Sequence, residues 1–262
     1  MKNKSLVSHM EAHDCIRATY FKIKLSDECL EDLKKYTANV LSNPNAHKDY
    51  TTKLAGHIKK GKQLQIPLQT KEVKDLVSVL SSAATQYYND YLKRGPLAAI
   101  EGVNSDHPFA LKGIQMQDLW LNSYYAGDYN PIHKHGTTSP IGLSCFIIIN
   151  VPESIKRTKE HKTVGDLGLV TGNDHFDGHT LLQWGYNYAS DSVMDSLEYV
   201  QQEYVKPEEG MIYLFPRWMS HLVNPFQGPG VRVTMAANIN IWTNKYYDIY
   251  NSYSEKMSKK TK

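Results

Sequence analysis

From about residue 113 the chain consists of short segments rich in β-branched and aromatic residues, which Gly, Pro and Asn separate. Such segments at close spacing are typical of antiparallel strands in a sandwich or barrel. Seven or eight strands are expected, with segments at residues 113–127, 140–150, 180–188, 198–205, 210–216, 221–226 and 231–242. This number of strands predicts a jelly roll, the cupin-like double-stranded β-helix.

Helical periodicity is clearest in the first 110 residues. Apolar residues recur at helical spacing over 29–41 and 70–94, which predicts two helices. Residues 18–26 alternate between apolar and polar side chains and predict a strand, whereas residues 1–15 are expected to be loose. The fold class is therefore mainly β, with the jelly roll supported by a layer of N-terminal helices.

The chain is expected to form one domain with three parts. These are a supporting region at 1–110, a jelly-roll core at 111–245 and a Tyr-rich, basic tail at 246–262. The last residues, KMSKKTK, are expected to be disordered. Two roles remain open for the tyrosines of the tail, which could pack on a second subunit of a homodimer or cap the barrel.

Composition excludes several function classes. A formal net charge of +3 is too small to indicate nucleic-acid binding, and no apolar run approaches the roughly 18 residues of a membrane span. The three cysteines are widely spaced and form neither a disulfide framework nor a CxxC metal pair. Together with the absence of a signal-peptide pattern, they predict a cytoplasmic protein.

The sequence NPIHKHGTTSP, residues 130–140, places His133 and His135 two positions apart. On a strand, side chains at that spacing share one face, so both imidazoles could bind one ion while Lys134 points outward. A pair of hydrogen-bonded surface histidines would have the same spacing. The HxH pair alone therefore does not establish a metal site.

A third histidine follows within residues 210–238, a segment that predicts strands joined by turns. His221 opens one strand and Arg232 lies on the next. If the intervening turn holds four residues, Arg232 faces Val223 across a hairpin and lies diagonally near His221, but a change of one residue would reverse its direction.

A metal beside an arginine suits an anionic ligand. Fe(II) held on one face by three protein ligands keeps positions open for a 2-oxo acid and dioxygen. The distal carboxylate of such an acid needs a cation with fork geometry, which Arg232 supplies. Thr234, two residues further, adds a hydroxyl on the same face.

Taken together, these motifs resemble those of the Fe(II)/2-oxoglutarate-dependent dioxygenases, and more closely their prolyl-hydroxylase-like branch with phage and marine bacterial members. The resemblance runs from about Trp120 to Trp242 and rests on W-L-N-S-Y-Y-x-G-D-Y-N-P-x-H-x-H, F-P-x-W-x-x-H-x-V-x-P-F and R-V-T-x-A-x-N. It implies an enzyme that uses Fe(II), 2-oxoglutarate and O2 to hydroxylate an unactivated C–H bond, with succinate and CO2 as co-products. The substrate would be a prolyl or other amino-acid residue, and the location the host cytoplasm for a phage-encoded chain.

The resemblance also implies roles for single residues. His133 and His221 would be iron ligands, and Arg232 would anchor 2-oxoglutarate with help from Thr234. Two further residues are expected to line the co-substrate pocket, namely Tyr124 and Asn122.

The acidic ligand of the family is replaced here by His135. Three interpretations follow: three neutral histidines hold the iron, Asp128 or another acid completes the site, or the iron is lost and the protein is inactive.

Two other functions remain open. Three histidines on a sheet could hold Zn(II) in a hydratase or hydrolase, although Arg232 and Thr234 would then have no role. A non-catalytic jelly-roll module could hold a structural metal. The DHFDGH sequence at 174–179 is expected to be a loop that closes over a substrate, which could be a protein, a peptide or a small molecule.

Overall fold

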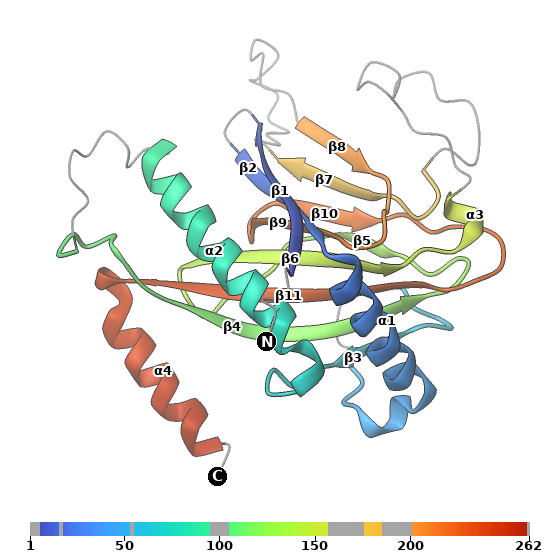
Figure 1. The fold of residues 1–262 in the computed structure, drawn as a ribbon, viewed down its shortest axis with the longest axis horizontal. Coiled ribbons are helices and arrows are strands. Elements are labelled where there is room, and N and C mark those ends of the chain that lie inside the picture. The colour runs from blue at the N-terminus through green and yellow to red at the C-terminus, as the bar shows by residue number, and fades with distance from the viewer. Residues whose placement is uncertain are drawn as a thin grey trace, which may run out of the picture.

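The computed structural model describes residues 6–15, 18–52, 55–94, 105–156, 176–184 and 201–260. Within them, two antiparallel β-sheets lie face to face (Figure 1). The larger sheet has the strand order β1 (Val7–Cys15), β2 (Ala18–Leu25), β9 (Met211–Pro216), β6 (Ile141–Asn150), β11 (Arg232–Thr243), β4 (Leu111–Tyr124) and β3 (Lys62–Gln65). The smaller sheet has the order β5 (Asn130–His133), β10 (Ser220–Val223), β7 (Thr180–Trp184) and β8 (Gln201–Val205). The predicted jelly roll is thus confirmed.

Helices cover the outer face of the larger sheet (Figure 1). Helix α1 packs against β6, and α2 packs against β4 and β11. α1 begins after Ser26, whose side chain accepts a hydrogen bond from the backbone N–H of Cys29 and so caps the first turn. The helices are α1 (Asp27–Ser42), α2 (Lys74–Arg94), α3 (Glu153–Lys156) and α4 (Tyr247–Lys260), with 3-10 turns η1 (Pro44–Ala46), η2 (Lys71–Val73) and η5 (Asn244–Tyr246).

The apolar core has two layers, one on each face of the larger sheet. On β6, Ile147 and Ile149 face the layer under the helices, whereas Phe146 and Ile148 face the smaller sheet. This alternation follows from the two-residue period of a strand. Because both faces are buried, the segment is a continuous apolar run in the sequence.

Both ends of the chain differ from expectation. Residues Val7–Cys15 form strand β1, which pairs with β2, instead of a loose segment. An edge strand with little buried surface needs no apolar pattern, so its polar sequence gave no signal. At the other end α4 continues to Lys260, although the last residues were expected to be disordered.

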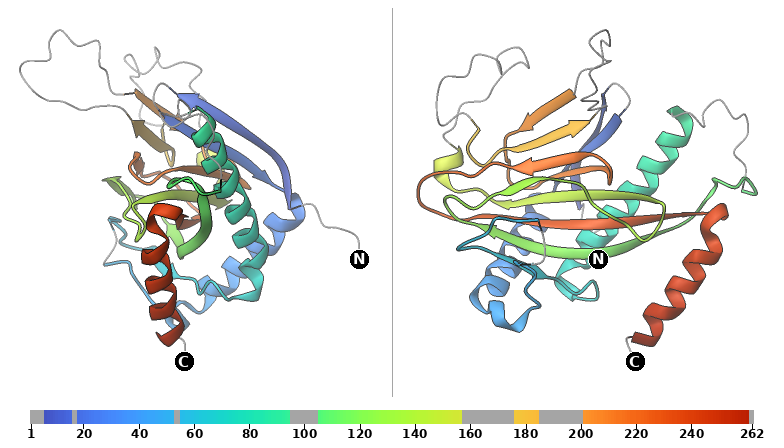
Figure 2. Two further views of the ribbon diagram at one scale, coloured as in Figure 1. Left: turned by 90° about the vertical axis from the view of Figure 1, so that its left-hand side faces the viewer. Right: turned by 180° about the vertical axis from the view of Figure 1, so that it is seen from behind.

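Tyrosines attach α4 to the larger sheet. Trp242, fully buried at the end of β11, has its ring centroid 5.5 Å from that of Tyr250 and 6.3 Å from that of Tyr253. The rest of the helix extends away from the sheets (Figure 2). In the described part of the chain, every helix is too short or too polar to cross a bilayer.

Candidate active site

A partly open cavity lies between the two sheets. The residues that the sequence predicted for the site all line it: Asn122, Tyr124, His133, His135, His221, Arg232 and Thr234. Residues that sequence reasoning did not assign to the site also line it: Trp120, Asn130, Cys145, Phe146, Thr180, Val223 and Ala236.

Strands β4 and β11 carry one wall of the cavity. They are neighbours in the larger sheet, where Tyr124 pairs with Arg232 and Asn122 pairs with Thr234. The Asn122 amide donates to Thr234 Oγ1 at 3.5 Å, and the Tyr124 hydroxyl hydrogen-bonds to Thr234 as well. Burial raises the pKa of Tyr124 to about 12, so its hydroxyl stays protonated at neutral pH and can donate.

The predicted hairpin between His221 and Arg232 is wrong. β10 pairs with β5 and β7, whereas β11 pairs with β4 and β6, so the chain crosses from one sheet to the other between them. Arg232 faces Tyr124 and not Val223 in its ladder. His221 and Arg232 still line the same cavity, because the two sheets face each other.

The three histidines form one cluster. His133 lies opposite His221 in the β5–β10 pair, and the ring centroids are 4.2 Å apart. His135 lies beyond the end of β5, contrary to the expectation of one strand for the HxH pair, and its backbone N–H donates to the carbonyl of Arg217 at 3.1 Å. Its Nε2 is 3.1 Å from Nε2 of His221, and the ligand atoms of all three lie within 4.8 Å of one another. As predicted, Lys134 is exposed.

Backbone carbonyls set the orientation of two of the imidazoles. Nδ1 of His133 is 2.8 Å from the Pro131 carbonyl, and Nδ1 of His221 is 3.3 Å from the Met219 carbonyl. A carbonyl only accepts, so each Nδ1 carries the hydrogen and each Nε2 presents a lone pair to the cluster. This is the arrangement of metal-binding histidines.

Burial keeps the histidines neutral. It lowers the pKa of His135 to about 4 and that of His221 well below its ordinary value, and repulsion between the imidazoles adds to the effect. Two ligand nitrogens about 2.1 Å from one ion and at a right angle would be about 3.0 Å apart. The separation of 3.1 Å between the His135 and His221 nitrogens therefore fits adjacent positions on a single ion.

Asp128 does not join this cluster. Its carboxylate accepts backbone N–H groups from Lys59, Gly61 and Tyr125 at 2.7, 2.9 and 3.0 Å, and a longer one from Lys60. Burial alone would raise the pKa of Asp128, but these four donors outweigh it and hold the pKa below its ordinary value. Since the described cluster contains no carboxylate, the interpretation in which Asp128 completes the site is wrong.

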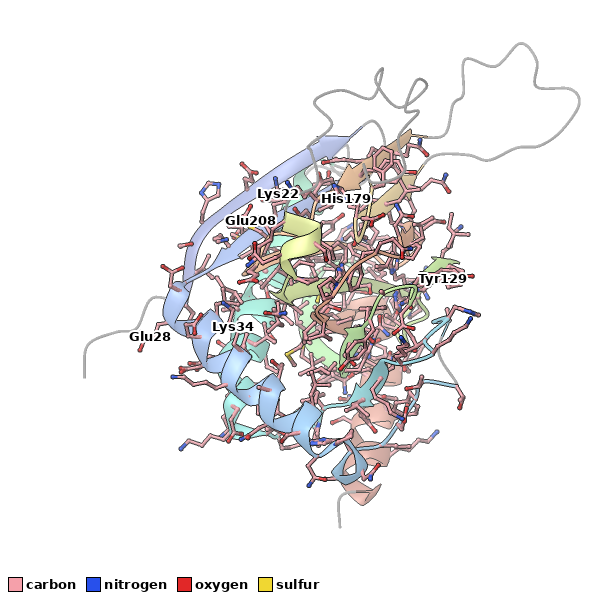
Figure 3. The ribbon with its side chains drawn as sticks, turned by 90° about the vertical axis from the view of Figure 1, so that its right-hand side faces the viewer. Lys22, Glu28, Lys34, Tyr129, His179 and Glu208 are labelled. Carbon is pink, nitrogen blue, oxygen red and sulfur yellow. The ribbon has the colours of Figure 1, made fainter. Side chains whose placement is uncertain are left out.

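The Asp128 carboxylate thus fastens the loop at 55–61 next to the end of β4. His57 in this loop exchanges backbone hydrogen bonds with Tyr129, which Figure 3 labels beside the loop.

Gly61 is expected to tolerate no side chain. A Cβ there would overlap the Ser123 carbonyl oxygen and contact the Asp128 carboxylate. We expect Gly61→Ala to lower the free energy of unfolding by about 3 kcal/mol, because the backbone at residue 61 and at Ser123 would have to move apart. Urea denaturation checks this, with Gly136→Ala as the control, since a Cβ at Gly136 meets no atom within 4 Å. Equal stability of the two variants would contradict the prediction.

Arg232 is a buried cation that forms no ion pair with any of the described residues. It is 1% exposed, and burial lowers its pKa to about 10. Nη2 donates to Thr180 Oγ1 at 3.2 Å, and the guanidinium carbon lies 5.3 Å from the centroid of the Tyr124 ring. Nε and Nη1 have no hydrogen-bond partner among the described residues. An unpaired buried charge is costly, so the arrangement indicates an anionic ligand in the cavity.

Two residues that the sequence did not assign complete the walls. Trp120 packs on His135 with ring centroids 5.7 Å apart, and its two-residue spacing from Asn122 was the signal that could have found it. Asn130 is 8% exposed, and its side-chain oxygen has no partner among the described residues. Asn130 belongs to the N-P-x-H-x-H part of the sequence motif, and this place three residues before His133 was the signal that could have found it.

The DHFDGH cluster is separate from the histidine site. Asp174 and His175 lie outside the described residues. In the described part, the Asp177 carboxylate accepts from the backbone N–H of Gln227 at 2.9 Å, and His179 does not belong to the metal-binding group. The expected lid therefore stays a prediction.

The donor set and the cavity fit the cofactors that the motifs imply. Three neutral imidazoles suit Fe(II), and the unpaired Arg232 suits the carboxylate of 2-oxoglutarate.

Comparison with known proteins gives a family and a fold. The sequence model of the family described as "Putative 2OG-Fe(II) oxygenase" matches residues 118–238. No curated protein matches the chain by sequence. A prolyl hydroxylase from Trichoplax adhaerens, solved with a peptide fragment of hypoxia inducible factor, is 13% identical, with a TM-score of 0.51 over 88% of this chain and 86% of that one.

The α-ketoglutarate-dependent carbocyclase SnoK from nogalamycin biosynthesis is 10% identical, also with a TM-score of 0.51, over 89% of this chain and 85% of that one. At these identities the two solved structures show a shared fold. The matched segment begins within β4, ends within β11 and contains every residue predicted for the site. The segment that carries the candidate site therefore matches the 2OG-Fe(II) oxygenases, enzymes that use Fe(II), 2-oxoglutarate and O2.

Proposed function

We propose that this oxygenase is a hydroxylase in which His133, His135 and His221 hold Fe(II) and Arg232 binds the distal carboxylate of 2-oxoglutarate. The observation that carries the proposal is that the unpaired Arg232 guanidinium shares a cavity with three clustered neutral imidazoles, two of which direct an Nε2 lone pair at the cluster. When bound, iron, 2-oxoglutarate and O2 supply the oxidising power that hydroxylates a C–H bond and releases succinate and CO2.

The protein would contribute binding, orientation and exclusion of water. Arg232 attracts the co-substrate and holds one end of it. The hydrogen bonds that join Tyr124, Thr234 and Asn122 keep their polar groups directed at the same end. Trp120 and Phe146 cover the cavity walls with apolar surface, which limits the access of water.

Three neutral ligands have an electrostatic consequence. Among the described residues, no carboxylate joins the histidine cluster to offset the charge of a bound metal ion. The site would therefore attract an anionic 2-oxo acid more strongly than a site with an acidic ligand.

We propose an amino-acid residue, such as a prolyl residue, in a peptide or protein as the substrate. The similar fold of a prolyl hydroxylase solved with a peptide supports this choice of substrate class.

The proposal is tested by anaerobic titration of the protein with Fe(II) and then with 2-oxoglutarate, while the visible charge-transfer band of a chelated 2-oxo acid is recorded. We expect a band with one iron per chain. We expect His133→Ala, His135→Ala and His221→Ala each to weaken iron binding by more than about 100-fold, because each removes a ligand. Lys134→Ala, an exposed residue between two of the histidines, is the control.

Each other result has a definite meaning. A band that survives in His135→Ala would make His135 a bystander. Tight zinc binding with no band in the wild-type protein would favour the zinc hydratase or hydrolase and reject the hydroxylase.

A further inference from the structure

His135 is held differently from the other two histidines of the cluster. His133 and His221 lie on paired strands, and each directs its Nδ1 at a backbone carbonyl. His135 lies beyond the end of β5, and its one hydrogen bond to a described residue outside the cluster joins its backbone N–H to the Arg217 carbonyl. A hydrogen bond from the second ring nitrogen normally fixes the orientation of a metal-binding imidazole. The His135 ring lacks such a bond, so a different contact orients it.

Three aromatic rings contact the imidazole of His135. Two of them belong to the cluster, with ring centroids 5.1 Å away for His133 and 4.9 Å away for His221. The third is the indole of Trp120 on β4, whose ring centroid lies 5.7 Å away at an interplanar angle of 35°. Within the described part of the chain, Trp120 is therefore the ring contact of His135 that comes from outside the cluster.

Packing of the apolar core does not account for Trp120. The indole is only 9% exposed, yet it belongs to neither of the two core layers. Its neighbours on β4, Leu119 and Leu121, both belong to the layer under the helices. Because side chains alternate along a strand, Trp120 faces the other way, into the cavity, where it lies beside Ala236 of β11. The indole thus serves the cavity wall and not the core.

A rigid indole against the imidazole restricts the rotation of the His135 side chain. A side chain without such a contact populates several staggered rotamers, and only a rotamer that directs Nε2 at the cluster can bind the shared ion. The apparent affinity for the ion falls with the fraction of molecules in that rotamer. Contact between two aromatic rings also stabilises their arrangement beyond the effect of buried area. Trp120 therefore favours metal binding by keeping the ligand in place.

We propose that Trp120 is a positioning residue for His135. Its indole holds the imidazole with Nε2 directed at Nε2 of His221, 3.1 Å away, and replaces the carbonyl contact that orients each of the other two histidines. A histidine at the position of the family's acidic ligand thus depends on an aromatic residue at position 120. This inference rests on the proposed function, in which the three histidines hold the metal.

The test compares Trp120→Leu, which removes the ring, with Trp120→Phe, which keeps one. Each protein is titrated with Co(II) in a calorimeter. We expect Trp120→Leu to weaken Co(II) binding by about tenfold and Trp120→Phe by less than about threefold. The control is Trp184→Leu, the same change at a buried tryptophan of the core that does not line the cavity, and it should leave the Co(II) affinity unchanged.

The same change in the His135→Ala background shows whether the effect acts through His135. There Trp120→Leu should alter the Co(II) affinity by less than about twofold, because the ring that it orients is absent. EPR of the Cu(II)-loaded protein is an independent readout, since the nitrogen splitting counts the bound imidazoles. We expect three nitrogens in the wild type and in Trp120→Phe, and a two-nitrogen component, the signal of His135→Ala, in Trp120→Leu.

Equal weakening by Trp120→Leu in both backgrounds would overturn the inference, because it would reveal an effect of cavity shape alone. An unchanged Co(II) affinity and EPR signal in Trp120→Leu would also overturn it. If thermal unfolding shows that Trp120→Leu does not fold, Trp120→Met replaces it in every measurement. A Co(II) affinity that does not change in His135→Ala would instead reject the three-histidine site of the proposed function, and the inference with it.

Discussion

Arg232→Met is expected to abolish binding of 2-oxoglutarate and to leave the ligand-free protein at least as stable as the wild type. Removal of one partner of a buried charge pair costs about 2–5 kcal/mol in binding, so the dissociation constant should rise by at least about 30-fold. Iron should bind as before, because the guanidinium is not among the ligand atoms of the histidine cluster.

The stability result is the more unusual half of this prediction. Burial lowers the pKa of Arg232 to about 10, which reflects the cost of holding a cation without an anion. An apolar side chain of similar length removes that cost, although Thr180 loses its partner. A residue retained against stability is typical of a functional site.

Calorimetry with 2-oxoglutarate and thermal unfolding of the ligand-free protein measure the two effects. Arg217→Met is the control, since that side chain is only half-buried and donates to the Pro140 carbonyl. A large loss of stability with unchanged affinity for 2-oxoglutarate would show that Arg232 is structural.

Asp128→Asn is expected to lower the free energy of unfolding by about 2–4 kcal/mol and to leave metal binding unchanged. The carboxylate accepts from four backbone N–H groups, and an amide would present its own N–H hydrogens to some of them. A buried donor left without an acceptor costs about 1–3 kcal/mol, and the lost charge weakens the remaining bonds.

The pH dependence follows from the same carboxylate. The folded-state pKa of Asp128 lies below its unfolded value of about 3.9, so its contribution to stability is complete above that value. The contribution is lost as the pH falls through the folded-state pKa. The stability of Asp128→Asn should therefore depend less on pH below about 4 than that of the wild type.

Urea denaturation at several pH values and Fe(II) titration test this prediction. The control is Asp106→Asn, at an exposed carboxylate. Loss of iron binding by a folded Asp128→Asn variant would restore Asp128 as a candidate ligand and contradict the present assignment.

Local sequence patterns determined the strands and much of the site. On β4 the two-residue period brings Trp120, Asn122 and Tyr124 to one face, and on β11 it does the same for Arg232 and Thr234. Such relations depend only on neighbouring residues, so they can be predicted without the fold. Because the prediction depended on local apolar patterns, it missed strand β1, a polar edge strand that has no apolar face.

Tertiary structure decided how these faces meet. It placed β10 and β11 in different sheets, so that Arg232 reaches the histidines across the cavity and not across a hairpin. It held His135 beyond the strand through the Arg217 carbonyl, and it enclosed Asp128 among N–H groups from a loop nearly 70 residues earlier. It also brought Thr180 within hydrogen-bonding distance of Arg232. Contacts between segments far apart in the chain depend on register and sheet membership, which the packing of the whole domain fixes and no local pattern encodes.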